Sequence, residues 1–262
     1  MGFVILAHED DGDGQPVVLL HSGVTDRGMW DPLVTPLGHT FRVIRPDLRG
    51  FGESPLPGGA YADCDDVDAL LEHLGVRGAA VVGSSFGGRV AMELAVRHPG
   101  RVSSLVLLCP AWRGLEVSDP QLLAFGEQED QLLEAGDVDA AAALNARAWL
   151  GPEAAEAARS EVARMQRRAF DVQRVADALE PAPEPERVPV DPSEITVPTT
   201  VVCGSHDFAH FRDVARALAE QIPGADLVEL PWAGHLPSLE RPDAVLALLL
   251  DVLRDDRDVH RP

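Results

Sequence analysis

Ser85 lies in the pentapeptide Gly83-Ser84-Ser85-Phe86-Gly87, which fits the pattern Gly-x-Ser-x-Gly. An apolar run (79–82) precedes it and a helix-like stretch follows it, so the pattern predicts a tight strand-to-helix turn with Ser85 at its tip. Glycine is expected at 83 and 87 because a larger side chain would collide with neighbouring elements. A serine hydroxyl held in this way is a candidate nucleophile for acyl transfer. The alternative is a glycine-rich helix start with a capping serine.

A serine hydroxyl is a poor nucleophile near neutral pH, so it needs a base, and the base needs a group that holds its tautomer. After such a turn, an acid and then a histidine are expected in chain order. Asp207 follows the apolar run 199–204, and His235 lies in a loop beside Gly234, before the last helical pattern. Taken singly, Asp207 has a simpler interpretation as a helix-start residue and His235 as an ordinary loop histidine. Their order favours a Ser85–Asp207–His235 triad.

The elements that must position these residues are short apolar runs alternating with amphipathic stretches. This alternation predicts an α/β fold in which a mostly parallel sheet has helices on both faces, and the ends of parallel strands meet at one edge. The turn-like residues 9–15 predict an antiparallel hairpin of the first two strands. The expected strands are 3–7, 16–21, 41–47, 79–83, 103–109, 199–204 and 226–231, and the expected helices are 63–74, 86–98, 210–221 and 238–253.

The alternation stops between residues 112 and 190. This stretch is rich in alanine, glutamate, arginine and leucine at helical spacing, contains no strand candidate and ends in a proline-rich extended return. We therefore predict an inserted all-helical cap at 112–190, with core segments at 1–111 and 191–262.

The chain has 262 residues and a formal net charge of −21. An acidic average field repels polyanions, so nucleic-acid binding is not expected. No apolar stretch approaches the roughly 20 residues of a membrane-spanning helix, so no membrane partner is expected. The three cysteines are scattered without metal-site or disulfide spacing, and the first residues carry no basic leader, which together favour a cytoplasmic protein.

Five segments, 17–32, 42–55, 81–99, 201–207 and 233–243, resemble the α/β-hydrolase superfamily in their order and motifs. The resemblance implies an α/β-hydrolase fold and an oxyanion hole made by the backbone amides of Gly23 and Phe86. The family usually has glycine where this chain has Ser22, which affects the backbone angle expected there. His21 is expected to brace its loop, and Asp47, Arg49 and Gly50 are expected to be structural.

Residues 23–32 are similar to the corresponding loop of 3-oxoadipate enol-lactonases, which implies a small ester or lactone substrate. Dehalogenases and epoxide hydrolases are set aside because they carry aspartate where this chain has Ser85. Carbon–carbon bond hydrolases are set aside because their usual Ser-Gly-Pro-Gly run is missing, and lipases because their caps are usually larger and more apolar. The expected reaction requires neither a metal ion nor an organic cofactor. Two alternatives stay open: a cofactor-free haloperoxidase or perhydrolase, and a small-molecule receptor with little turnover.

Large side chains near these loops and in the predicted cap are candidates for lining the substrate pocket, although packing in the core is the commoner role of such residues. The oligomeric state is left open. The candidates are Trp30, Trp112, Trp149, Phe208 and Leu236.

Overall fold

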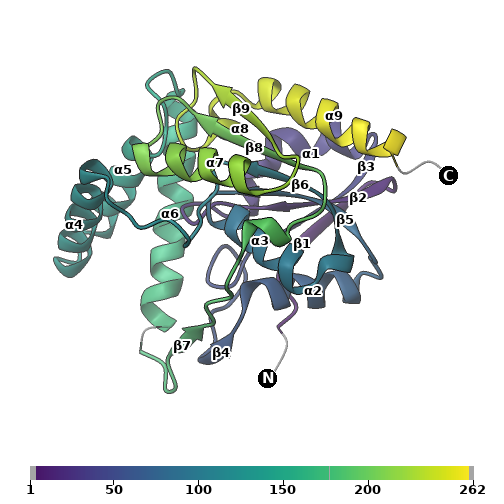
Figure 1. Cartoon of the computed structure of the whole chain (residues 1–262). Coiled ribbons are helices and arrows are strands. Elements are labelled where there is room, and N and C mark those ends of the chain that lie inside the picture. The colour runs from purple at the N-terminus through teal and green to yellow at the C-terminus, as the bar shows by residue number, and fades with distance from the viewer. Residues whose placement is uncertain (1–3, 177, 260–262) are drawn as a thin grey trace.

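The computed structural model describes residues 4–176 and 178–259. Within them, seven strands form one sheet in the order β1-β3-β2-β5-β6-β8-β9 (Figure 1). Every neighbouring pair is parallel except β1 and β3, which confirms the predicted mostly parallel sheet. The strands are β1 (His8–Asp11), β2 (Gln15–Leu20), β3 (Phe41–Pro46), β5 (Ala79–Ser84), β6 (Val102–Leu108), β8 (Thr199–Gly204) and β9 (Asp226–Leu230).

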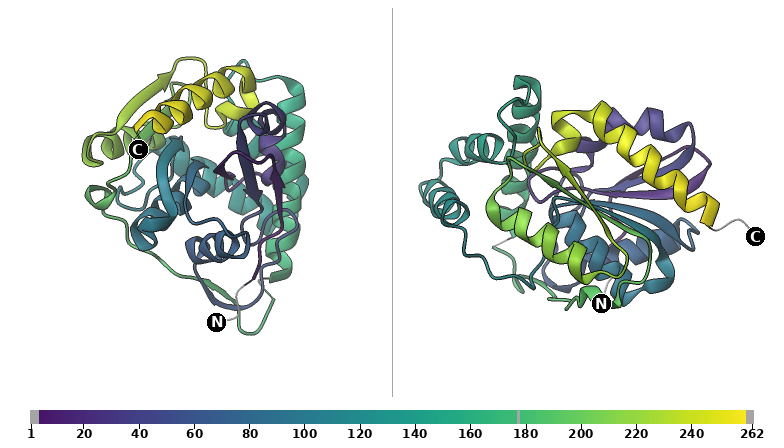
Figure 2. Two further views of the ribbon diagram at one scale, coloured as in Figure 1. Left: turned by 90° about the vertical axis from the view of Figure 1, so that its right-hand side faces the viewer. Right: turned by 45° about the horizontal axis from the view of Figure 1, so that its top comes forward.

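Helices cover both faces of this sheet (Figure 2). Alternate residues of a strand point to opposite faces, so Val18 and Leu20 pack in one apolar cluster while Val17 and Leu19 pack in the other. The first cluster includes residues of α2 (Asp63–His73), α3 (Phe86–Arg97) and α7 (Ala209–Gln221). The second includes residues of α1 (Asp31–Gly38) and α9 (Pro242–Val259). Burial on both faces explains why the central strands are apolar throughout.

The predicted hairpin of the first two strands is wrong. β1 pairs with β3, and β3 lies between β1 and β2. The connection crosses the start of β3 closely: a Cβ at Gly12 would lie 2.3 Å from the Phe41 carbonyl oxygen, and one at Gly14 would lie 2.2 Å from that of Thr40. The glycines therefore allow a close crossing of backbones. The predicted strand 3–7 is also misplaced, since residues 4–7 are not strand and residue 3 lies outside the described residues.

Between β6 and β8 the described residues form three α-helices, α4 (Pro120–Glu134), α5 (Val138–Ala148) and α6 (Glu156–Ala176). Figure 1 shows them together on one side of the sheet. The stretch is not entirely helical, because β7 (Pro183–Pro185) pairs with β4 (Gly59–Tyr61) in a separate two-stranded sheet. Proline cannot continue a helix, and extended backbone suits such pairing. The division of the chain at residues 112 and 190 stays a prediction.

The remaining elements are the short helices η1 (Arg27–Trp30), η2 (Pro99–Arg101), η3 (Pro192–Glu194) and α8 (Pro237–Glu240). Among the described residues, none of the helices combines the length and apolar character that crossing a membrane requires.

Candidate active site

Ser85 is the single residue between β5 and α3, and its backbone is strained. Its φ of 51° and ψ of −110° are unusual for a residue with a side chain, and such a conformation costs about 1–3 kcal/mol. Three hydrogen bonds hold it: the Ser85 amide donates to the Leu108 carbonyl (2.9 Å), and its carbonyl accepts from the amides of Arg89 (3.1 Å) and Ala111 (3.0 Å). The start of α3 and the end of β6 thus fix the turn that presents the hydroxyl.

The glycines on either side of this turn are required by contact with other backbone atoms. A Cβ at Gly83 would lie 2.4 Å from the Gly87 carbonyl oxygen, and one at Gly87 would lie 2.3 Å from the Leu20 carbonyl oxygen. These separations are shorter than real Cβ contacts, so β5, α3 and β2 approach each other only because both side chains are absent. The predicted crowding at positions 83 and 87 is confirmed.

Ser85, His235 and Asp207 are joined by two hydrogen bonds. The Ser85 hydroxyl lies 2.7 Å from His235 Nε2, and His235 Nδ1 lies 2.7 Å from Asp207 Oδ2. Because an ionised carboxylate only accepts, Nδ1 carries the hydrogen and Nε2 is left free to accept the serine proton. The side chains of His235 and Asp207 are 2% and 1% exposed, so this network is shielded from water.

Asp207 has a second partner that orients it. Its Oδ1 accepts a hydrogen bond of 2.7 Å from the Phe208 amide, while Oδ2 faces His235. Each carboxylate oxygen therefore has one donor. Asp207 is the third residue after β8, in the loop where the sequence predicts it.

The loop that carries His235 is held by Glu240 of α8. Its carboxylate accepts from the amide of Gly234 (2.9 and 3.1 Å) and from that of Gly151 (3.1 Å). Burial raises the pKa of Glu240, although these hydrogen bonds oppose the shift. Glu240 thereby ties the histidine loop to the segment between α5 and α6.

Aromatic rings surround the imidazole of His235. The ring centroid of Trp149 lies 4.7 Å away and that of Phe211 lies 4.3 Å away, and the His235 amide donates to the Trp149 carbonyl (2.9 Å). The indole of Trp149 donates to Asn145 Oδ1 at 2.7 Å. Sequence analysis missed Phe211 and Asn145. The available signal for Asn145 was its spacing of four residues from Trp149 on one helical face.

Gly23 lies against Phe86, the residue that follows Ser85. A Cβ at Gly23 would lie 3.3 Å from the Phe86 Cβ, and Phe86 is the first residue of α3, where an amide has no partner within its helix. Among the described residues, neither amide donates a hydrogen bond in a loop or turn. The assignment of these two amides to an oxyanion hole stays a prediction.

His21 holds the loop that carries Gly23. It is completely buried, its Nε2 accepts from the Leu48 amide (2.8 Å), and its Nδ1 donates to the Ser22 carbonyl (2.8 Å). Burial lowers the pKa of His21, which keeps the imidazole neutral in this arrangement. These contacts agree with the bracing role expected for this residue.

The structure places the five candidate lining residues in three different surroundings: near His235, at a separate cavity, and in the apolar core. Trp149 contacts His235, and Phe208 contacts Trp149 with a centroid separation of 5.2 Å. Trp112 lines a different cavity, which none of the triad residues borders. Trp30 and Leu236 are 0% exposed and pack in the apolar cluster shared with α1 and α9. A lining role for any of them stays a prediction.

Cys109 adds a third potential metal ligand beside two triad residues. Ligand atoms of Cys109, Asp207 and His235 lie within 4.8 Å of one another, and all three residues are buried. Burial raises the pKa of the Cys109 thiol well above its usual value, which disfavours the thiolate that a metal would need. The hydrogen bond between Asp207 and His235 already uses two of the three groups. The group fits a proton-transfer site better than a metal site.

A model of the family described as "Alpha/beta hydrolase family" matches residues 17–248 of this chain. A 2-hydroxymuconate semialdehyde hydrolase from Pseudomonas sp. (strain CF600) is 40% identical over 106 residues, a match that spans 38% of this chain and 38% of that protein.

Two similarities extend over nearly the whole chain. BpoC from Mycobacterium tuberculosis, whose name assigns it provisionally as a non-heme bromoperoxidase, is 30% identical, with 94% of this chain and 96% of that protein covered. The crystal structure of the enol-lactonase from Burkholderia xenovorans LB400 superposes with a TM-score of 0.75 at 29% identity, covering 95% of this chain and 96% of that one. Both the sequence and the fold of this chain therefore match known proteins over nearly their whole length.

Proposed function

This chain belongs to the alpha/beta hydrolase family, and we propose that it is a serine hydrolase that cleaves a small ester or lactone through an acyl-enzyme on Ser85. The observation that carries the proposal is the continuous hydrogen-bonded chain from Ser85 through His235 to Asp207. A hydroxyl, an imidazole and a carboxylate in this order are the parts of a nucleophile, a general base and a group that orients the base.

In the first half of the reaction, His235 Nε2 takes the hydroxyl proton as Ser85 Oγ bonds to the ester carbonyl carbon. The ionised Asp207 stabilises the imidazolium that forms. His235 then returns the proton to the leaving oxygen as the carbon–oxygen bond of the ester breaks. For a lactone, the leaving oxygen stays attached to the acyl group.

In the second half, water replaces the alcohol. His235 takes a proton from water, the hydroxide oxygen bonds to the acyl carbon, and the bond from that carbon to Ser85 Oγ breaks while Oγ recovers a proton. The carboxylic acid leaves and the enzyme is restored. The same residues thus serve both halves of the reaction.

Each tetrahedral intermediate places negative charge on the former carbonyl oxygen. We assign the amides of Gly23 and Phe86 as the donors that stabilise it, because Gly23 lies against Phe86, Phe86 follows Ser85, and neither amide donates a loop or turn hydrogen bond among the described residues. One such donor typically contributes about 2.7–4 kcal/mol to the stability of the transition state. The positive end of the α3 dipole adds to this field.

The substrate class rests on similarity. The enol-lactonase is similar over almost its full length, and residues 23–32 resemble the matching loop of 3-oxoadipate enol-lactonases. We place the predicted cap, 112–190, over this site, with Trp149 and Phe208 as the candidate lining residues nearest His235. A small acyl group suits a site enclosed by these rings.

The similarity to BpoC favours a second candidate, a cofactor-free perhydrolase in which peroxide replaces water in the second half. The two activities use the same triad and differ in the nucleophile that attacks the acyl-enzyme. Comparing peracid formation from acetate and peroxide with hydrolysis of an aryl acetate separates them. Faster peracid formation would favour the perhydrolase.

The direct test is labelling with a fluorophosphonate, followed by peptide mass spectrometry and turnover measurements on a panel of lactones, enol-lactones and short esters. We expect one label on Ser85 and multiple turnovers of at least one substrate, with typical enzymes reaching about 10 per second. Label on another residue contradicts the assignment. Labelling of Ser85 with less than one turnover per bound ligand would favour a receptor of the same fold.

A further inference from the structure

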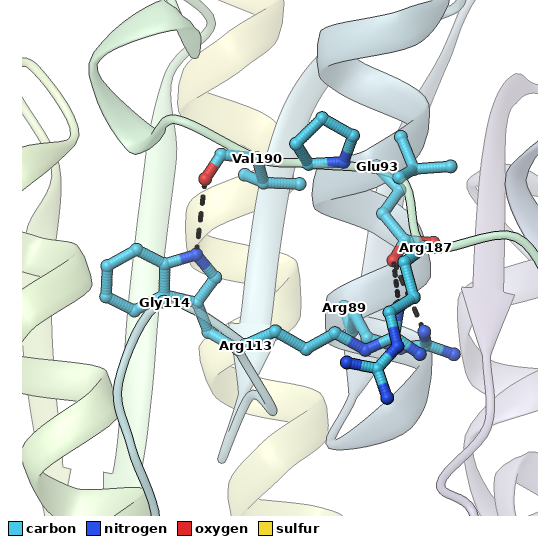
Figure 3. Close-up of a pocket in the computed structure, with 9 residues that line it drawn as sticks. Arg89, Glu93, Arg113, Gly114, Arg187 and Val190 are labelled. Atoms are coloured by element: carbon cyan, nitrogen blue, oxygen red, sulfur yellow. Dashed lines mark hydrogen bonds and ion pairs between the residues drawn. The ribbon is translucent and has the colours of Figure 1, made fainter.

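A cavity of about 310 Å³ opens beside α3, away from the triad. It lies between that helix, the residues that follow β6 and the return segment before β8, and none of Ser85, Asp207 and His235 lines it (Figure 3). Its size is at the lower end of the range for small-molecule sites. The lining residues are Arg89, Glu93, 112–114 and 187–190.

Three arginine side chains line this cavity, and they differ in how many carboxylates they pair with. Arg89 pairs with Asp63 (3.2 Å) and Glu93 (3.3 Å) and is mostly buried. Arg113 has Glu93 as its one ion-pair partner among the described residues, at 3.8 Å. The side chain of Arg187 has no hydrogen-bond or ion-pair partner within residues 4–176 and 178–259. The guanidinium groups of Arg113 and Arg187 therefore have N–H donors that are free to bind a ligand in the cavity.

The local charge balance favours an added anion. Three guanidinium groups face at most two carboxylates, those of Asp63 and Glu93. Partial burial, with the positive charges of Arg89 and Arg187, lowers the pKa of Arg113. Burial is the larger cause, and the two neighbouring guanidinium groups act in the same direction against the opposing effect of Glu93. Figure 3 shows Arg113 and Arg187 extending toward the side of the cavity where Arg89 meets Glu93.

The rest of the lining is largely apolar. The indole of Trp112 donates to the Val190 carbonyl at 3.4 Å, which joins the two loops across the cavity. Trp112 also packs directly on Gly114, where a Cβ would lie 2.1 Å from the ring. Val188 is buried and completes the wall beside Val190.

We propose that this cavity binds a small carboxylate with an apolar or aromatic body, whose carboxylate is held by Arg113 and Arg187 and whose body packs against Trp112 and Val188. A planar guanidinium donates two parallel hydrogen bonds to a carboxylate, which favours this anion over a spherical one. The proposal does not depend on the reaction at Ser85, since none of Ser85, Asp207 and His235 lines this cavity.

The test is calorimetric titration of the full chain with phenylacetate, with the neutral isostere phenylacetamide as the matched ligand. We expect saturable binding of phenylacetate and at least tenfold weaker binding of phenylacetamide, a difference of about 1.4 kcal/mol or more. Arg187→Met should weaken phenylacetate binding about tenfold, because the exposed side chain can lose its charge without disturbing the core. Arg77→Met is the control, since Arg77 is an exposed arginine in the turn before β5.

Three outcomes overturn the proposal: no binding of phenylacetate up to about 10 mM, equal binding of the amide, or undiminished binding by both Arg187→Met and Arg113→Met. Near-identical unfolding temperatures of these variants would exclude loss of the fold as a cause. Hydrolytic activity of the same samples reports separately on Ser85, so failure at one site is distinguishable from failure at the other.

Discussion

The Nε2 atom of His235 lies 2.7 Å from the hydroxyl oxygen of Ser85, although 150 residues separate them in the chain. The sheet makes this possible, because β5, β8 and β9 are parallel and the loops after them emerge at the same edge. The relationship predicts how substitutions at this edge affect catalysis.

Replacing Ser85 by alanine should lower hydrolysis of a p-nitrophenyl short-chain ester by several orders of magnitude, because the nucleophile is removed. The measurement is the steady-state rate of hydrolysis, corrected with blanks that contain no enzyme. Ser84→Ala is the matched control: Ser84 is completely buried in β5 and its hydroxyl has no partner among the described side-chain groups, so its removal should leave the rate nearly unchanged. Near-normal rates for Ser85→Ala would refute the nucleophile assignment.

Asp207→Asn should lower the rate by roughly 10⁴-fold while the protein stays folded. An amide at this position presents a donor to His235 and favours the wrong imidazole tautomer. Kinetics and circular dichroism on the same preparation check both parts. A folded variant with more than about a tenth of the wild-type rate would show that Asp207 does not orient the base.

Asn145→Ala should destabilise the protein by about 1–3 kcal/mol, because the buried indole nitrogen of Trp149 loses its acceptor. Urea unfolding measures the change. In the Trp149→Phe background, which has no indole donor, the same substitution should cost clearly less. Equal costs in both backgrounds would mean that the hydrogen bond does not account for the effect.

Glu93 should make stability depend on pH. Burial raises its pKa to about 7, against the opposing effect of Arg89, so the folded state holds the proton more tightly than the unfolded chain. Wild type should therefore lose about 2–3 kcal/mol relative to Glu93→Gln as the pH rises from 5 to 8. Urea unfolding at both pH values tests this; a constant difference would contradict it. The groups that act on Glu93 are Asp63, Arg89, Arg97 and Arg113.

The same proton should affect the proposed carboxylate cavity. Protonated Glu93 leaves Arg113 without its partner and removes a negative charge from the wall, so phenylacetate should bind more tightly at pH 6 than at pH 8. Calorimetry in buffers matched for ionic strength measures the difference. It should largely disappear in Glu93→Gln, and a pH effect that persists there would point to another group.

The elbow at Ser85 could be predicted from the sequence because its signals are local. An apolar strand, two glycines and a helical pattern follow one another within about 20 residues, and each has a steric reason. The crowding against Leu20 and Gly87 makes the glycines obligatory. Asp207 and His235 could be found because residues that follow buried strands must emerge at the same edge.

Other features depend on contacts between distant segments, which periodicity does not encode. The connection from β1 to β2 passes close to the start of β3 at two glycines, and β3 lies between those strands. The local sequence of this connection has the residues of a hairpin turn. Phe211 reaches His235 only because α7 packs beside β8.

The sequence by itself determined the α/β architecture, the elbow at Ser85 and the chain order of the proposed triad, because steric and hydrophobic patterns along the chain specify them. Only the tertiary structure decided which residues meet across elements. Arg89, Arg113 and Arg187 come from a helix and two separate loops, and their side chains share one cavity because of how those segments pack. Side-chain packing in three dimensions sets charge balance and burial, so these properties follow from the fold rather than from residue spacing.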